Sequence, residues 1–262
     1  MTRLPLDFGC GSLKLAGTLD TAPGTTGLLI VSGGNEVRSG AFSGQARLAT
    51  RIALAGFPVF RFDRRGIGDS EGENRGFRST RKDISSALEA FRAIAPQIER
   101  VVGFGNCDAA SALMLAQGAG CDGLVLSNPW TIDDAPSDNG DNTPPPAAIR
   151  ARYAKKLKDP AEIARLLRGG VNLRKLARGL LKSASSAAEP SSLAAEMQAG
   201  LEAFAGPVRF LLATSDRTAQ IFEENWGNAD ARIARCEGAG HAYIEAEHRD
   251  WLDKQILAAL RS

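Results

Sequence analysis

Short apolar runs alternate along the chain with segments in which apolar residues recur at helical spacing. The runs are GLLIVSGG from residue 27, FPVFRFD from 57, RVVGFG from 100, DGLVLSN from 122 and PVRFLLATSD from 207. Amphipathic segments at Gln45–Ala55, Thr80–Ala95 and Ala109–Gln117 separate most of them. Strands that are apolar at nearly every position are buried on both faces, so the pattern predicts a parallel sheet with helices on both sides.

The two ends of the chain extend this pattern. Near the start, Leu4–Phe8 and Ser12–Leu19 are predicted strands, and the GCG between them suits a hairpin. Near the end, a strand in ARIARCEG at 231–238 precedes a closing amphipathic helix, Tyr243–Leu260. Thr80 and Asp83 have capping-box spacing at the start of their helix. The whole predicts an α/β fold with an eight-stranded, mostly parallel sheet flanked by helices.

Residues 130–205 do not follow this rhythm, so we expect a core domain of 1–129 and 206–262 with a helical lid, 130–205, inserted after the sixth strand. The insertion opens with DDAPSDNGDNTPPP, which predicts an irregular loop, and continues with helical segments at Ala147–Lys158, Ala161–Leu167, Leu173–Lys182 and Ser192–Phe204. Between 147 and 182 the sequence contains eleven Lys or Arg residues and only two acidic residues. This basic surface is either a solvated helix face or a site for an anionic carrier or substrate handle.

The composition is that of an ordinary globular protein. Hydrophobic residues make up 44% and charged residues 24% of the chain, and the formal net charge is +2. No segment approaches the roughly 20 apolar residues of a membrane span. The N-terminus lacks an apolar run of signal-peptide length, and the four cysteines form no C-x-x-C pair, so we expect a cytoplasmic protein with free thiols. We expect no integral membrane segment, no nucleic-acid partner and no cofactor.

A metal site is not expected either. The two histidines, His241 and His248, would lie about 10.5 Å apart along the axis if they shared one helix. That separation is too large for both to bind one metal ion, and no other cluster of residues has ligand spacing.

The segment GFGNCDAAS at 103–111 marks a sharp turn from a strand into a helix, and three interpretations compete. A dinucleotide-binding loop needs a small residue where Asp108 stands, and that carboxylate would repel phosphates. A nucleophile elbow needs small residues two before and two after the reactive side chain, and Gly105 and Ala109 flank Cys107 in this way. In a plain connection Cys107 would be a small buried thiol. The elbow is favoured because it follows the fifth predicted strand.

An acid and a histidine should follow such a nucleophile, in that order. Asp216 comes directly after the strand VRFLLAT, where a carboxylate can point into the site; its alternative role is that of a helix N-cap. His241 lies in the glycine-bracketed EGAGHAY, between the last strand and the last helix. His248 is the rival base, but it falls inside the closing helix among charged residues. We therefore predict that Cys107, Asp216 and His241 are the catalytic residues.

Backbone N–H groups should hold the oxyanion of such a site. One is expected from Asp108, directly after the nucleophile, and another from Gly34 or Asn35 in the SGGN loop. The glycines of this loop let the backbone approach a substrate.

Two longer segments carry a resemblance to a known family. SGGNEVRSG, after the third strand, and GFPVFRFDRRGIGDSEG, around the fourth, resemble the α/β-hydrolase superfamily. Together with CDAASALMLA, LSNPW, LLRGGVNLRKLARGLL and HAYIEAEHRDWL they resemble the exosortase A system-associated hydrolases, which have cysteine at the elbow. The resemblance implies an α/β-hydrolase fold and a bacterial enzyme linked to the exosortase and exopolysaccharide system. It implies no particular substrate.

The predicted chemistry is acyl transfer through a covalent intermediate on Cys107. A thiolate is readily expelled from its own tetrahedral intermediate, which favours small-molecule esters, lactones or thioesters over amides. Hydrolysis of an ester or thioester is therefore the leading hypothesis. The alternatives are an acyltransferase that uses the same acyl-enzyme and a non-catalytic binding protein of this fold in which Cys107 is structural.

Overall fold

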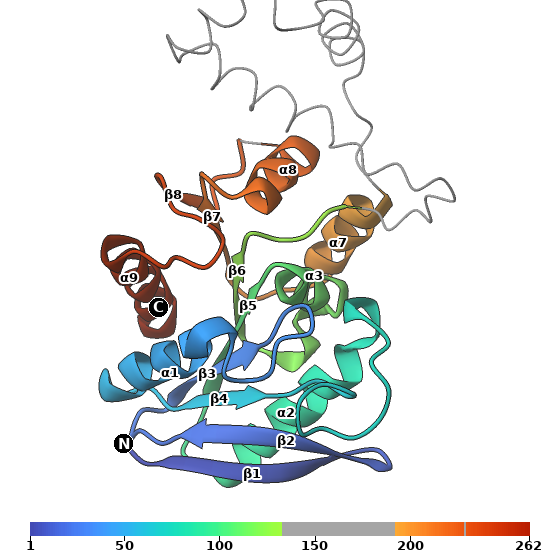
Figure 1. Ribbon diagram of the computed structural model, residues 1–262, viewed down its shortest axis with the longest axis vertical. Helices are drawn as coiled ribbons and strands as arrows, with labels where there is room; N and C mark the ends of the chain where they lie inside the picture. The colour runs from blue at the N-terminus through green and yellow to red at the C-terminus, as the bar shows by residue number, and fades with distance from the viewer. Residues whose placement is uncertain (133–191, 228) are drawn as a thin grey trace, which may run out of the picture. The chain divides into compact units, whose positions relative to one another are not determined.

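The computed structural model describes residues 1–132, 192–227 and 229–262. Within them, eight strands form one sheet in the order β1-β2-β4-β3-β5-β6-β7-β8 (Figure 1). The strands are β1 (Arg3–Cys10), β2 (Leu13–Asp20), β3 (Thr26–Val31), β4 (Val59–Phe62), β5 (Arg100–Asn106), β6 (Gly123–Ser127), β7 (Val208–Ala213) and β8 (Ile233–Cys236). β2 is antiparallel to both β1 and β4, whereas all other neighbours are parallel. The expected eight-stranded, mostly parallel sheet is confirmed.

Helices cover both faces of this sheet (Figure 1). Side chains along β3 alternate between two cores, with Leu28 and Ile30 in one and Leu29 and Val31 in the other. The first core is shared with α1 (Gly44–Leu54) and α9 (Ala246–Arg261). The second is shared with α2 (Arg81–Ile94), α3 (Asp108–Leu115), α7 (Ser192–Glu202) and α8 (Arg217–Trp226). Strands apolar at successive positions are thus buried from both sides, as the sequence predicts.

Three short 3₁₀ turns lie between these elements: η1 (Ala41–Ser43), η2 (Phe77–Ser79) and η3 (Gln117–Gly120). Within the described residues, no helix combines the length and apolar character that crossing a membrane requires.

Helix α7 lies in the core domain, although the sequence predicted it as part of the lid. Leu193 and Met197 of α7 are buried, and Gly200 lies so close to α3 that an added Cβ would collide with the carbonyl oxygen of Met114. Met1–Thr131 and Ser192–Ser262 form one compact unit. The core therefore resumes at 192 rather than 206, because α7 buries its apolar side against α3. The other predicted lid helices, and the basic surface at 147–182, lie outside the described residues.

Two helix starts also differ from expectation. The side chain of Thr80 makes no capping hydrogen bond to α2, and the carboxylate of Asp83 accepts a hydrogen bond from the guanidinium of Arg65 instead. The predicted capping box is therefore wrong. The closing helix begins at Ala246 and not at Tyr243. Tyr243 has a left-handed φ of 49°, which is incompatible with a right-handed helix, so α9 cannot include it. Its buried ring stacks on Trp251.

Candidate active site

Cys107 lies at the turn between β5 and α3, with φ 61° and ψ −129°. A non-glycine residue in this region is strained, and such strain persists where the surroundings fix it. The N–H of Cys107 donates to the carbonyl of Ser127 (3.0 Å), and its carbonyl accepts from the N–H groups of Ala110 (3.1 Å) and Ser111 (3.3 Å). These bonds hold the turn and leave Cys107 half-buried.

The small residues on either side of Cys107 let β5 and α3 meet. A Cβ built on Gly105 would lie 2.6 Å from the carbonyl carbon of Ala109 and 2.7 Å from its oxygen. Ala109 is itself fully buried. Gly33, in the loop after β3, is equally confined, because its Cβ would lie 2.8 Å from the carbonyl oxygen of Asn106. The spacing that predicted an elbow therefore has a steric reason.

His241 and Asp216 meet at the same edge of the sheet. Nδ1 of His241 is 2.8 Å from Oδ2 of Asp216, which follows β7 and is 8% exposed. The same oxygen accepts a hydrogen bond from the N–H of Ala219 (3.3 Å) as the N-cap of α8. The two roles considered for Asp216 are thus compatible, since the cap fixes the carboxylate that orients the imidazole.

The neighbours of His241 favour its protonated form. They raise the pKa of His241 from 6.5 to about 10, first through the hydrogen bond to Asp216 and then through the one to Cys107, while burial opposes both. Because Nδ1 is bonded to Asp216, Nε2 is the nitrogen left to exchange a proton with the thiol. Cys107, His241 and Asp216 are therefore brought together in the order a proton relay requires.

Two asparagines that the sequence pattern did not predict hold the backbone of His241. The side-chain amide of Asn106 donates to the carbonyl of His241 (3.3 Å), and that of Asn128 donates to Oδ1 of Asn106 (3.0 Å). Oδ1 of Asn128 accepts from the N–H of Ala213 (2.8 Å). Asn128 is fully buried with φ 42°, a conformation that asparagine tolerates well. A polar residue at the end of each buried strand was the signal that could have identified them.

The loop after β3 and the start of α3 contain the predicted oxyanion donors. The N–H of Gly34 donates to Oδ1 of Asp108 at 2.6 Å, so this amide is already engaged, contrary to the role expected for it. Within the described residues, the backbone N–H groups of Asn35 and Asp108 have no hydrogen-bond partner. These two amides remain the predicted donors.

Arg64 balances the carboxylate of Asp108. Its buried guanidinium lies 3.6 Å from Oδ2 of Asp108 and also donates to the carbonyl of Gly34 and to Thr80 (3.4 Å). The Nε of Arg64 has no partner among the described residues. Arg64 belongs to the segment that follows β4, so this segment, the loop after β3 and the helix after β5 are joined next to Cys107.

The other histidine and cysteines lie apart from this arrangement. His248 bonds to Glu245 (3.0 Å) rather than to Asp216, although its side chain is only 12% exposed and thus less solvated than expected. Burial raises the pKa of the Cys121 thiol to about 12, which keeps that thiol unreactive. Within the described segments, no group of three His, Cys, Asp or Glu side chains could hold a metal ion.

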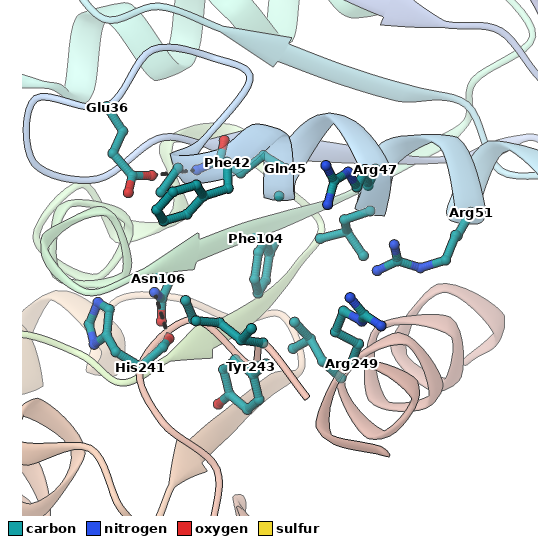
Figure 2. A pocket seen from close by; sticks show the side chains of 16 residues that line it. Glu36, Phe42, Gln45, Arg47, Arg51, Phe104, Asn106, His241, Tyr243 and Arg249 are labelled. Carbon is teal, nitrogen blue, oxygen red and sulfur yellow. Dashed lines mark hydrogen bonds between the residues drawn. The ribbon is translucent and has the colours of Figure 1, made fainter. Parts of the chain in front are cut away.

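A cavity of about 220 Å³ begins beside His241 and Asn106. Figure 2 shows these two residues at one end, Phe42 and Phe104 in the middle, and Arg47, Arg51 and Arg249 at the other end. Its walls come from the region of η1 and α1 and from residues 241–252, on the face of the sheet that α1 and α9 cover. Of Cys107, His241 and Asp216, only His241 lines this cavity, so a small molecule bound in it would lie next to the imidazole.

Comparison with known proteins agrees with this architecture. Residues 28–254 match the family model described as the alpha/beta hydrolase family, and the chain therefore belongs to that family. No curated protein sequence matches the chain significantly.

Solved structures share the fold at low identity. The alpha/beta hydrolase GrgF from Penicillium sp. sh18 is 18% identical with a TM-score of 0.65, covering 100% of this chain and 98% of its own. The Pyrococcus furiosus esterase Pf2001 is 13% identical with a TM-score of 0.61, covering 99% and 90%. XC6422 from Xanthomonas campestris, described as a serine hydrolase without a lid, is 13% identical with a TM-score of 0.59, covering 100% and 94%. The eight-stranded α/β-hydrolase fold is thus confirmed.

Proposed function

We propose that this protein hydrolyses a carboxylic ester or thioester through a covalent acyl-enzyme on Cys107. The observation that carries the proposal is the 2.8 Å contact between His241 and Asp216 beside a cysteine held at a strained turn after β5. Family membership adds the expectation of hydrolytic chemistry, and an esterase among similar structures favours ester substrates.

The proton of the Cys107 thiol resides on Nε2 of His241, whose protonated form its neighbours favour, and acylation begins from this thiolate–imidazolium pair. The thiolate attacks the carbonyl carbon, a C–S bond forms, and the carbonyl electrons move to oxygen, which accepts hydrogen bonds from the amides of Asn35 and Asp108. When the tetrahedral intermediate collapses, the bond to the leaving alcohol or thiol breaks and the imidazolium gives it a proton. Asp216 holds the imidazolium in place throughout.

Deacylation repeats these steps with water. His241 takes a proton from a water molecule, the hydroxide attacks the acyl carbon, and the C–S bond breaks as the carboxylic acid is released. The Cys107 thiolate and the protonated His241 with which the cycle began are thereby restored. A thiolate leaves readily, so the route suits esters and thioesters better than amides, whose amine is a poor leaving group.

A turnover assay with matched variants tests this proposal. The substrates are 4-nitrophenyl acetate and the acetyl thioester of N-acetylcysteamine. Cys107→Ala should lower turnover by a factor of at least about 10³, as loss of a nucleophile does, whereas Cys121→Ala, which removes a buried thiol elsewhere, should keep it. Equal turnover by the wild type and Cys107→Ala would overturn the proposal, as would no turnover of either substrate.

An acyltransferase is the alternative function, because a thioester acyl-enzyme can pass its acyl group to an amine or alcohol instead of water. Adding primary amine and alcohol acceptors to the same assay separates the two. Hydrolysis predicts free acetate as the main product at every acceptor concentration. The link to an exosortase system rests on the sequence resemblance given above, and it is part of the proposal.

A further inference from the structure

The cavity beside His241 has a mostly apolar middle and a cationic far end. Phe42, Phe104 and Ile244 line it together with Leu48 and Leu252. Gln45 and Tyr243 add polar groups between the two ends, and the hydroxyl of Tyr243 is bonded to Ser127. Phe42 is 86% exposed and Ile244 66% exposed. Phe42 also has a left-handed φ of 49°, so its ring is held at the cavity by a strained backbone conformation. Large apolar side chains held open beside a reactive group suit an apolar ligand.

The three arginines at the far end differ in how they are held. Arg51 is fixed by the carboxylate of Asp253, with which it forms two hydrogen bonds. Arg47, on α1, and Arg249, on α9, form no ion pair within the part of the chain that the structure describes, and both are exposed. Two guanidinium groups from different helices therefore converge on the end of an apolar cavity with their charges available to a ligand.

The size of the cavity bounds the ligand. Gln45 and Arg51 both line it and are six residues apart on α1, which corresponds to about 9 Å along the helix axis. The cavity extends at least this far along α1, and His241 and the arginines lie at its opposite ends, so a ligand that reaches from one end to the other contains a chain of several carbons. The mostly apolar walls offer few partners for amide groups in such a chain, so methylene groups suit them better than a peptide-like or pantetheine-like arm.

We infer that the acyl group of the substrate is a medium-length chain ending in an anionic group, with the chain along Phe42 and Phe104 and the anion between Arg47 and Arg249. This inference rests on the proposed function, because it takes Cys107 as the point of acylation. The substrate class is an ester or thioester of a dicarboxylic acid, or of an acid with a terminal phosphate. Glu36, which lines the cavity near the His241 end, disfavours the opposite orientation by repelling the anion.

Matched substrates test this specificity. Mono-4-nitrophenyl esters of six-, eight- and ten-carbon dicarboxylic acids are compared with the same esters in which the free carboxylate is a primary carboxamide of equal size. For the best chain length, kcat/KM should be about tenfold higher for the carboxylate. This corresponds to about 1.4 kcal/mol for the two exposed ion pairs together. A third series carries the carboxylate on the aryl leaving group and should show no such preference.

Charge reversal assigns the preference to the cavity. Arg47→Glu with Arg249→Glu should lower the carboxylate-to-carboxamide ratio of kcat/KM to one or below. Arg81→Glu with Lys82→Glu reverses the same number of charges on α2, on the opposite face of the sheet, and should leave the ratio unchanged. A ratio is used because it does not depend on the fraction of folded or active protein.

The outcomes separate the two proposals. Turnover of 4-nitrophenyl acetate that depends on Cys107, without any carboxylate preference, would overturn the inference and leave the proposed function standing. A preference that survives the double charge reversal, or that appears only for the anionic leaving group, would also overturn it. Absence of turnover for every ester would overturn both.

Discussion

Replacing Gly105 by alanine should misplace Cys107 without removing any polar group of the site. The new Cβ would lie 2.6 Å from the carbonyl carbon of Ala109 and 2.7 Å from the nitrogen of Ala110, both of them backbone atoms at the start of α3. Ordinary van der Waals contact begins at 3.4 Å, so β5 and α3 must separate locally by nearly 1 Å. Because the turn carries Cys107, its thiol must move relative to His241.

The magnitude follows from that displacement. Overpacking of this kind costs about 1–3 kcal/mol of folding free energy, which corresponds to a Tm lower by roughly 2–4 °C for each kcal/mol in a chain of this size. A misplacement of about 1 Å in an active site can lower the rate by about 10². We therefore expect Gly105→Ala to fold, melt several degrees lower, and lose about two orders of magnitude in kcat/KM for 4-nitrophenyl acetate.

Gly9→Ala is the matched control. Gly9 lies in β1, and no atom lies within 4 Å of a Cβ built on it, so this substitution should change neither Tm nor kcat/KM appreciably. The rate of Cys107 alkylation by iodoacetamide gives a second measure of the turn that needs no substrate. If Gly105→Ala matched the wild type within threefold in activity and within 1 °C in Tm, the tight elbow would not be what positions Cys107.

Three further predictions follow from contacts in and around the site. First, the pKa of His241 is about 10 in the folded chain and 6.5 when unperturbed. The contribution of protonated His241 to the free energy of unfolding is therefore complete below pH 6.5 and disappears as pH rises through about 10. For a ring that is 40% exposed this contribution is on the order of 1 kcal/mol. Urea titrations at pH 6 and pH 10 should show its loss in the wild type and a much smaller loss in Asp216→Asn. Equal losses in the two proteins would refute the assignment. Second, Asp108→Ala removes the carboxylate beside the buried guanidinium of Arg64 as well as the acceptor of the exposed Gly34 N–H, and should cost about 1–3 kcal/mol. Asp108→Asn keeps an acceptor and should cost less, and indistinguishable urea midpoints would contradict this. Third, Asn128→Ala removes the acceptor of the buried Ala213 N–H and places alanine at φ 42°, so the free energy of unfolding should fall by about 2–3 kcal/mol; a loss below about 0.5 kcal/mol would show that the bond is dispensable.

Much of the fold follows from local patterns in the sequence. Buried parallel strands are apolar at successive positions, which is why β3, β5 and β6 could be predicted from runs of Val, Leu and Ile. The elbow could be predicted because its steric demand falls on neighbours in sequence, Gly105 and Ala109. The meeting of Asp216 and His241 could be predicted because parallel strands deliver their following residues to one edge of the sheet.

The features that sequence did not predict depend on contacts between distant segments. The bonds of Asn106 and Asn128 to each other and to His241 join the end of β5 to two loops, and no local spacing encodes them. Gly34 was expected to bind the oxyanion, but Asp108 occupies its N–H across 74 positions of sequence. The place of α7 in the core likewise depends on how its apolar side fits α3, which its own apolar pattern does not reveal.

Intact mass measured after brief exposure to substrate tests the central claim most directly. The wild type is mixed with an excess of 4-nitrophenyl butyrate or a butyryl thioester, quenched in acid within the first turnovers, and compared with Cys107→Ala. We predict one butyryl adduct on the wild type that maps to the peptide containing Cys107, disappears as substrate is consumed, and is absent from the variant. An adduct of the same yield on Cys107→Ala, or turnover by the wild type with no adduct at Cys107 under any quench time, would contradict the acyl-enzyme account.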